Sequence, residues 1–385
     1  MLRGLTLVTL LGLLLGAAGS RSGEAARRCT ITGTNGPDVL VGTPRRDVIC
    51  GLGAGDVIRA GAGDDIIYGG RGDDAIYPGA GRDVAHGDSG SDTFFSVDGA
   101  RDFIDGGPDS DRARIDRDRA RSIERFFRNG KYPLVLAAGD IATCIGTGDD
   151  RTAILLDAYP NAVVATLGDT VYPSGSAEEF AKCYAPSWGR AKRRTRPAVG
   201  DHEYETPGAS AYFAYFGSAA GAPEKGYYSY DIRRWHVVVL NTHCIAIGGC
   251  GPNSPETLWL RTDLAQHAAS SCTLAYFHRP RFSSGTMGPG GRVATLFKTL
   301  NDAGAEVVLS GDDHFYERFA PQNADGGRDP THGIRQFVVG TGGKSFSPFG
   351  PIQPNSEVRN DSTFGVLKLS LRPAGYAWEF IPVAG

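Results

Sequence analysis

The sequence Gly168-Asp169-Thr170-Val171-Tyr172 directly follows the apolar run Ala162–Leu167, AVVATL. Such a run has the length and composition of a buried parallel strand. A carboxylate just past this kind of strand lies at the strand's carboxyl end, where open α/β sheets bind their ligands. The two oxygens of Asp169 could bridge two cations, and Tyr172 could add a phenolate oxygen to a strongly Lewis-acidic metal. A Gly-Asp pair after a strand is also a common turn, so the segment needs support from elsewhere in the chain.

Four other predicted strand ends carry residues of the same kind. They are Asp140 in AAGDIA, Asp201 and His202 in VGDHEY, His278 in YFHRP, and Asp312 and His314 in SGDDHFYER. Gathering ionised groups at one place is costly unless a cation neutralises them. The sequence therefore predicts a metal centre at one edge of an α/β domain. Asp313 is expected to face solvent.

The order of these motifs, GDI, GDxxY, GDHE, a separate histidine and GDDH, resembles that of the calcineurin-like metallophosphoesterase superfamily. The purple acid phosphatase-like branch is the most similar, because it also lacks a histidine two residues after the first aspartate and uses the tyrosine instead. The resemblance spans about Tyr132–Pro382 and includes flanking segments such as CTLAYFHRPRFSSG and QFVVGTGG. It implies an α/β domain with a β-sandwich flanked by helices.

The resemblance also implies a dinuclear centre that hydrolyses phosphate mono- or diesters through a metal-bound hydroxide. The first metal, Fe³⁺ by this resemblance, would take Asp140, Asp169, Tyr172 and His314. The second metal, Zn²⁺, Mn²⁺ or Fe²⁺, would take Asp169, Asp201, His278 and Asp312. Two cations about 3.5–4 Å apart clamp the phosphate oxygens and activate a water. His202 matches the histidine that contacts the phosphate and helps to protonate the leaving group, which is its expected catalytic role.

Two residues depart from the family's pattern. Asp201 stands where the family has Asn, and Asp312 where it has His. Both add negative charge at the second metal, which favours harder cations such as Mn²⁺, Mg²⁺ or Ca²⁺ over Zn²⁺. Arg279 either holds phosphate or is a surface charge. An alternative of another class therefore stays open: a calcium-dependent extracellular binding protein with a decayed hydrolase site.

The other histidines have no motif support and receive no predicted role. They are His86, His236, His243, His267 and His332.

A nine-residue repeat precedes this domain. From Gly33 its units are GTNGPDVLV, GTPRRDVIC, GLGAGDVIR, AGAGDDIIY, GGRGDDAIY, PGAGRDVAH and GDSGSDTFF. Position six is Asp and position eight is apolar in every unit. A flexible Gly/Asp linker would not keep apolar residues in phase. The pattern predicts a parallel β-roll, in which Gly-rich turns alternate with short strands around a thin core.

The units resemble RTX (haemolysin-type) calcium-binding repeats, whose pattern is GGxGxDxUx. Aspartate and carbonyl oxygens in the turns are hard ligands that suit Ca²⁺. The inner units match best, and the calcium ligands expected there are Asp56, Asp65, Asp74 and Asp83. The unit with Pro44-Arg45-Arg46 in place of the glycines makes an outer site doubtful.

The N-terminus predicts export. Arg3, the apolar run Leu5–Leu15 and the small residues that follow have the layout of a secretory signal with cleavage within Ala18–Ala26. The run is shorter than the about 20 residues of a transmembrane helix, so no transmembrane anchor is expected. Seven cysteines fit an oxidising compartment, with Cys29–Cys50 and Cys244–Cys250 as plausible local pairs and one cysteine left over.

The predicted organisation has four parts. They are a signal peptide (1–26), the calcium-binding β-roll (27–111), a charged linker or cap (112–131), for which a solvated surface is the preferred interpretation, and the metallophosphoesterase domain (132–385). The net charge of −3 argues against nucleic-acid binding. A phosphate ester is the expected partner, and the sequence leaves the oligomeric state open.

Overall fold

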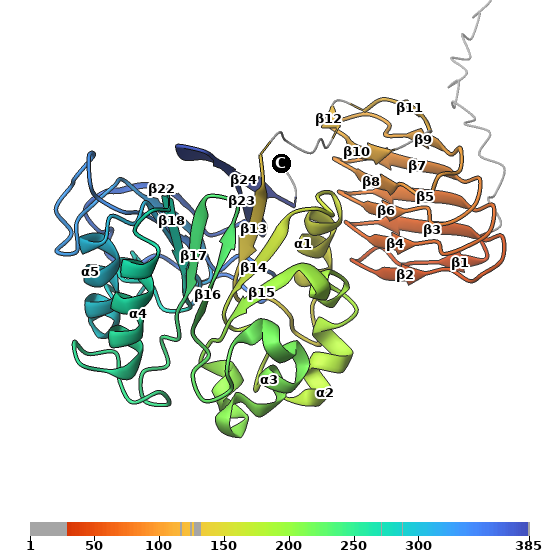
Figure 1. Cartoon of the computed structure of the whole chain (residues 1–385). Coiled ribbons are helices and arrows are strands. Elements are labelled where there is room, and N and C mark those ends of the chain that lie inside the picture. Colours follow the sequence, from red (N-terminus) through yellow and green to blue (C-terminus); the bar gives the residue numbers. More distant parts are fainter. Residues whose placement is uncertain are drawn as a thin grey trace, which may run out of the picture.

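The computed structural model describes residues 29–115, 118–123, 125–126, 132–270, 272–286 and 288–383. The predicted signal peptide lies outside these residues. The described chain forms a ladder of short strands beside a larger α/β unit (Figure 1).

The ladder is a parallel β-roll of two six-stranded sheets. One sheet contains β1 (Ile31–Thr32), β3 (Val48–Gly53), β5 (Ile66–Arg71), β7 (Val84–Ser89), β9 (Phe103–Asp105) and β11 (Arg119–Arg121). The other contains β2 (Val39–Val41), β4 (Val57–Arg59), β6 (Ala75–Tyr77), β8 (Thr93–Ser96), β10 (Arg112–Ile115) and β12 (Arg125–Phe126). Ile49 pairs with Ile67 and Ile58 with Ile76, so one turn of the roll takes two nine-residue units. These isoleucines are fully buried between the sheets, which confirms the predicted roll.

The charged segment after residue 111 supplies the last strands of the roll, β10, β11 and β12. The preferred interpretation from the sequence, a surface solvated along its whole length, does not describe this segment. Arg112 is buried and donates to the carbonyl oxygen of Pro382 at 3.2 Å. Arg114 donates to the carbonyl oxygen of Ala158 at 2.5 Å. Arg112 and Arg114 thus donate hydrogen bonds to backbone carbonyls of the second unit, whereas a solvent-facing position was preferred for these charges from the sequence.

The second unit is a sandwich of two sheets. The five-stranded sheet has the order β15 (Thr195–Ala198), β14 (Val163–Leu167), β13 (Leu134–Ala138), β23 (Gly365–Arg372), β24 (Gly375–Pro382). The seven-stranded sheet has the order β16 (Tyr228–Ile232), β17 (Trp235–Val239), β18 (Cys272–Tyr276), β19 (Val307–Ser310), β21 (Arg335–Val339), β20 (Tyr316–Phe319), β22 (Ser356–Asn360). Strands β13, β14 and β15 run parallel, as do β17, β18, β19 and β21.

Helices cover the outer faces of the sandwich. The α-helices are α1 (Gly148–Asp157), α2 (Ala177–Glu179), α3 (Ser210–Phe216), α4 (Pro255–Gln266) and α5 (Ala294–Asp302). Short turns are a π-helical turn, η1 (Phe180–Tyr184), and the 3₁₀ turns η2 (Trp188–Arg194), η3 (His202–Glu205), η4 (Pro207–Ala209), η5 (Gly217–Ala220) and η6 (Gly291–Val293). Helices α4 and α5 lie together on the side of the seven-stranded sheet, and α1 lies next to the roll, with α2 and α3 below it in the view of Figure 1. The predicted β-sandwich flanked by helices is confirmed.

The apolar core follows from these layers. Leu136 of β13, Leu274 of β18 and Phe337 of β21 belong to one fully buried cluster between the two sheets. A second cluster joins Val308 of β19 to Phe297 of α5 on the outer face. Strands buried on both faces read as continuous apolar runs, which is why the sequence revealed them.

The roll packs against α1. Its residues Val57, Ala75 and Phe95 join the same apolar cluster as the buried face of that helix. At the rim, Arg59 pairs with Asp150 of α1 at 3.1 Å. The roll and the α/β unit therefore share an apolar contact with a polar edge.

Three disulfides are formed: Cys29–Cys50, Cys144–Cys183 and Cys244–Cys250. The two local pairs expected from the sequence are confirmed, and among the described residues Cys272 is the free cysteine, buried in β18. Within that same part of the chain, helices long and apolar enough to cross a bilayer are absent.

Candidate metal centre

The predicted ligands lie just past the carboxyl ends of neighbouring strands. Asp140 follows β13, Asp169 follows β14 and Asp312 follows β19. All three have positive φ, at 58°, 48° and 72° respectively. Non-glycine residues adopt this conformation rarely, and such backbone strain is concentrated at functional sites. The backbone is thus strained at the three residues that place a carboxylate in the site.

Tyr172 is the middle of the first group of side chains. Its hydroxyl lies 2.8 Å from Asp140 Oδ1, 2.9 Å from Asp169 Oδ2 and 3.2 Å from His314 Nε2. His314 Nε2 is also 3.3 Å from Asp140 Oδ1. Ser345 Oγ lies 2.8 Å from Nδ1 of the same histidine, on the side away from the group. Three potential ligand atoms therefore lie within hydrogen-bond distance of the Tyr172 hydroxyl, which is itself a fourth.

This convergence suits a cation. The phenol has one proton to offer to two carboxylates and an imidazole. Burial, reinforced by the charges of Asp140 and Asp169, raises the pKa of Tyr172, so the phenol stays protonated without further positive charge. A phenolate here requires a cation between the four groups, which is the arrangement that the family resemblance implies.

His278 is the middle of the second group. Its Nε2 lies 2.9 Å from Asp201 Oδ1 and 3.4 Å from both Asp169 Oδ1 and Asp312 Oδ1. The other ring nitrogen, Nδ1, lies 2.9 Å from the carbonyl oxygen of Leu167, which accepts its proton. In the neutral ring that bond leaves the lone pair on Nε2, the tautomer of a metal ligand.

The second group also has orphaned atoms. In the described part of the chain, His278 Nε2 and Asp201 Oδ1 are buried and make no hydrogen bond, although they are close together. Burial acts to lower the pKa of His278, but the carboxylates of Asp169, Asp201 and Asp312 outweigh it and raise that pKa well above its usual value. The site therefore attracts a positive charge, which either a proton or a metal ion supplies.

Asp169 faces both groups. Its Oδ2 contacts Tyr172, whereas its Oδ1 lies near His278 and accepts the backbone N–H of His202 at 3.0 Å. Its backbone is clamped by Glu203, whose carboxylate accepts the N–H groups of Asp169, Thr170 and Gly200. Burial and the charge of Asp169 raise the pKa of Glu203 to about 7. Sequence reasoning gave Glu203 no role, although it belongs to the GDHE motif.

His202 and Arg279 stand at the edge of the cluster. His202 Nδ1 lies 2.6 Å from the carbonyl oxygen of Pro173, and Nε2 lies 3.9 Å from Asp169 Oδ2. The imidazole is 39% exposed, so a substrate can reach it. Arg279 Nη2 donates to Asp201 Oδ2 at 2.8 Å.

A cavity of about 190 Å³ opens next to these residues. Arg279, Arg292 and Asp312 contribute to its lining. Asp313, expected to face solvent, is instead buried and accepts a hydrogen bond from Ser283. A hydroxyl partner from a distant segment explains why this carboxylate can be inside.

The aspartates of the roll form two buried rows. Oδ1 of Asp56, Asp65, Asp74 and Asp83 each accepts a backbone N–H from the aspartate 18 residues earlier, at 2.8 Å. Oδ2 of each is buried without a hydrogen-bond partner in the described chain. Burial raises the pKa of Asp56 to about 6, of Asp83 to about 7 and of Asp74 to about 8.

The glycines of the repeat keep these unpartnered oxygens close to carbonyl groups. A Cβ atom at Gly51 would collide with Asp56 Oδ2 and the carbonyl oxygen of Gly69 together. Carboxylate and carbonyl oxygens gathered in a space that admits no side chain fit Ca²⁺. Asp56, Asp65, Asp74 and Asp83 remain the predicted calcium ligands.

A comparison with family models supports the prediction of calcium-binding repeats in the first unit. The RTX calcium-binding nonapeptide repeat matches residues 51–85 and 79–101. The roll is built of RTX repeats. The search of curated proteins found no match to this sequence.

A comparison with solved structures identifies the fold of the second unit. A purple acid phosphatase from seeds of yellow lupin (Lupinus luteus) matches 66% of this chain with a TM-score of 0.54 and 16% identity. The match covers 52% of the lupin chain, about half its length. GAP50, the anchor in the inner membrane complex of Plasmodium, matches 65% of this chain and 84% of its own at 12% identity and a TM-score of 0.48. The second unit thus has the fold of purple acid phosphatase, and at this identity the likeness concerns the fold alone.

Proposed function

We propose that this protein is a secreted phosphoesterase that hydrolyses phosphate mono- or diesters at a dinuclear metal centre. One observation carries the proposal: two adjoining groups of carboxylate, phenol and imidazole ligand atoms share Asp169 and have too few protons to satisfy one another. A fold shared with purple acid phosphatase supports it.

The side chains divide between two ions. Asp140, Asp169, Tyr172 and His314 would hold the first, and Asp169, Asp201, His278 and Asp312 the second. When bound, the two metals would polarise the phosphoryl group and activate a water molecule. Fe³⁺ suits the phenolate site. The two carboxylates in place of Asn and His make a hard divalent ion such as Mn²⁺ the better occupant of the second.

Two further residues serve the substrate. With Nδ1–H of His202 held by the carbonyl of Pro173, a second proton on Nε2 is directed toward the cluster, where it can be given to the leaving alkoxide. Asp169 Oδ2 lies 3.9 Å from this nitrogen. Arg279 uses Nη2 to hold Asp201, and its remaining N–H groups stay available for phosphate oxygens.

The compartment follows from the covalent chemistry. Three disulfides are typical of an oxidising environment. RTX repeats that bind Ca²⁺ agree with an extracellular site, where this ion is abundant. We therefore include export in the proposal.

The test is hydrolysis of p-nitrophenyl phosphate and bis-p-nitrophenyl phosphate after loading with Fe, Zn or Mn, at pH values from about 5 to 9. We expect turnover by the wild type and by Asp302→Asn, an exposed control, and loss of turnover in Asp169→Asn. Failure of every metal to give turnover would contradict the proposal. Retained calcium binding in that case would favour the alternative, an extracellular binding protein with a decayed site.

A further inference from the structure

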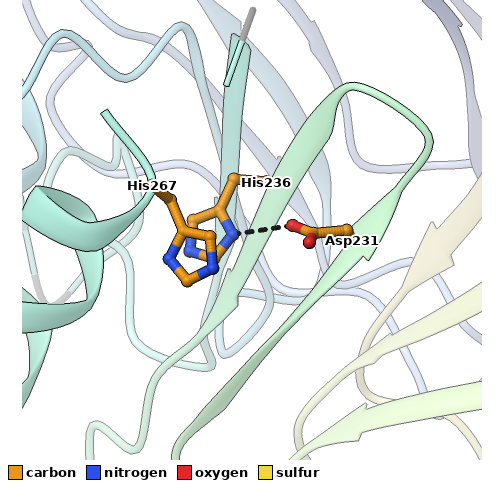
Figure 2. A group of neighbouring side chains, drawn as sticks. All are labelled: Asp231, His236 and His267. Carbon is orange, nitrogen blue, oxygen red and sulfur yellow. Dashed lines mark hydrogen bonds and ion pairs between the residues drawn. The ribbon is translucent and has the colours of Figure 1, made fainter. Parts of the chain in front are cut away.

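A second cluster of ligand-type side chains lies away from the dinuclear centre. It consists of Asp231 of β16, His236 near the start of β17 and His267 at the end of α4 (Figure 2). One ligand atom of each lies within 4.8 Å of the others. The dinuclear centre stands at the carboxyl ends of the strands, whereas His236 is at the amino end of its strand. The two clusters therefore lie at opposite ends of the parallel strands.

His236 is held between two carboxylates. Nδ1 lies 3.0 Å from Asp231 Oδ1, and Nε2 lies 2.8 Å from Asp263 Oδ2. Asp263 is almost buried and already accepts a hydrogen bond from Ser229 at 2.7 Å. It is an ionised acceptor, so Nε2 of the neutral ring carries the proton and donates it. The lone pair then stands on Nδ1, directly opposite an oxygen of Asp231.

His267 is prepared in the same way. Its Nδ1 lies 2.8 Å from the backbone carbonyl of Asp263, which can only accept. That bond leaves the lone pair of the neutral ring on Nε2. A metal-binding histidine almost always donates its other N–H to a carboxylate or a backbone carbonyl, and here both histidines do so.

The facing pair of lone pairs needs a positive charge. His236 Nδ1 and Asp231 Oδ1 are both acceptors when the imidazole is neutral, and 3.0 Å is too close for two acceptors without a cation or a proton between them. The side chain of His236 is 1% exposed, whereas those of Asp231 and His267 are 55% and 33% exposed. A small ion can therefore enter from solvent and find one rigid ligand and two adjustable ones.

We propose that Asp231, His236 and His267 form a third transition-metal site, oriented by Asp263 and suited to Zn²⁺. Two imidazoles and one carboxylate are a donor set that Zn²⁺ accepts in tetrahedral geometry, with water as a fourth ligand. The two rings are stacked, with centroids 3.8 Å apart and planes 11° apart. Metal binding would turn the exposed His267 ring out of this stack, so that its Nε2 lone pair points at the ion. The ion would fasten the edge hairpin β16–β17 to the end of α4.

The experiment is metal analysis of the full chain. Wild type, Asp231→Asn and His267→Ala are dialysed in Ca²⁺ against about 10 μM free Zn²⁺ near pH 7.5, and the zinc per chain is measured. We expect each variant to hold one ion fewer than wild type. His332→Ala, which removes an exposed histidine elsewhere, is the control and should keep the wild-type content. The three proteins retain Asp169 and His278, so the difference does not depend on the dinuclear centre or its activity.

A second measurement separates a ligand from a structural residue. With Cu²⁺ as the probe, the nitrogen hyperfine pattern of the wild type minus that of His267→Ala should show the loss of an imidazole-coordinated ion. Equal zinc content in wild type and both variants would overturn the proposal, and the positive charge beside Asp231 would then be a proton on His236.

Discussion

Removal of calcium should unfold the roll at neutral pH and leave it folded in acid. Burial raises the pKa of Asp74 to about 8 and that of Asp92 to about 9, against about 3.9 in an unfolded chain. Each pH unit between the two values is worth about 1.4 kcal/mol. At pH 7 the folded roll keeps Asp74 protonated whereas the unfolded chain ionises it, so folding loses on the order of 4 kcal/mol relative to acid, and Asp92 adds a similar loss. Together these approach the about 5–15 kcal/mol that stabilises a typical domain.

The sign follows from the direction of the shift. A carboxyl whose pKa is raised by folding stabilises the fold while it is protonated. The contribution is complete below about pH 4 and is lost as the pH rises through about 8. Calcium reverses this dependence, because it replaces the missing protons with a bound charge.

The assay uses the full chain and two signals. All four tryptophans, Trp188, Trp235, Trp259 and Trp378, belong to the second unit, so tryptophan emission reports that unit alone. Far-ultraviolet circular dichroism reports both units. In a calcium chelator we expect the dichroism of β structure to fall between pH 4 and pH 8 while the emission stays unchanged, and Ca²⁺ to restore the dichroism.

A matched pair of variants sharpens the test. Asp74→Asn removes the buried charge, so it should raise the stability of the calcium-free roll at pH 8 by a few kcal/mol and weaken calcium binding. Asp73→Asn keeps the bond from the Ser91 N–H and should change either quantity little. The reasoning is refuted if the chelated protein has the same dichroism at pH 5 and pH 8.

Three further predictions concern single residues. Glu256, fully buried at the start of α4, has its pKa raised to about 8 by burial, so Glu256→Gln should gain about 1.4 kcal/mol of stability over wild type per pH unit from about 4.5 to about 8, with equal stabilities in acid; chemical denaturation at several pH values checks this, and a pH-independent difference would contradict it. His202→Asn should lower kcat about 10²- to 10⁴-fold with the metal content intact, measured with p-nitrophenyl phosphate, whereas loss of metal in this variant would argue against a role in proton transfer. Ile67→Ala in the core of the roll should cost about 2–5 kcal/mol in the calcium-bound state, measured by thermal unfolding, and Val41→Ala, 63% exposed, should be neutral; equal effects would mean that the phased apolar positions do not form the core.

The sequence predicted what depends on a regular pattern. The nine-residue phase placed Ile49, Ile58 and Ile67 in the core of the roll, and the apolar runs before Asp140 and Asp169 became buried parallel strands. The roll repeats one pattern in every turn, and the parallel strands are buried on both faces, so spacing and composition alone predict these elements.

Edge elements escaped prediction. Strand β15 has the sequence TRPA, and its Pro and Arg argue against a strand, but at the edge of a sheet a proline is tolerated. Strand β22 is also an edge, with mostly exposed side chains and no apolar alternation. The segment 177–184 forms one α-helical turn followed by a π-helical turn, which lacks the regular spacing of a longer helix.

Buried polar partners escaped it too. Glu203 is inside because N–H groups from two strand ends converge on it, and Asp313 because Ser283 reaches it across 30 residues. His236 and His267 meet only because α4 returns to the hairpin. Such contacts depend on tertiary structure, which no local pattern in the sequence encodes.

The central claim, a dinuclear centre bridged by Asp169, is tested most directly by the transition-metal content of the purified protein. The measurement is best made on His267→Ala, so that the proposed third site does not contribute. The proposed centre predicts two ions per chain in this protein and a loss of metal when Asp169→Asn is added. No ion or a single ion per chain, unchanged by Asp169→Asn, would contradict it.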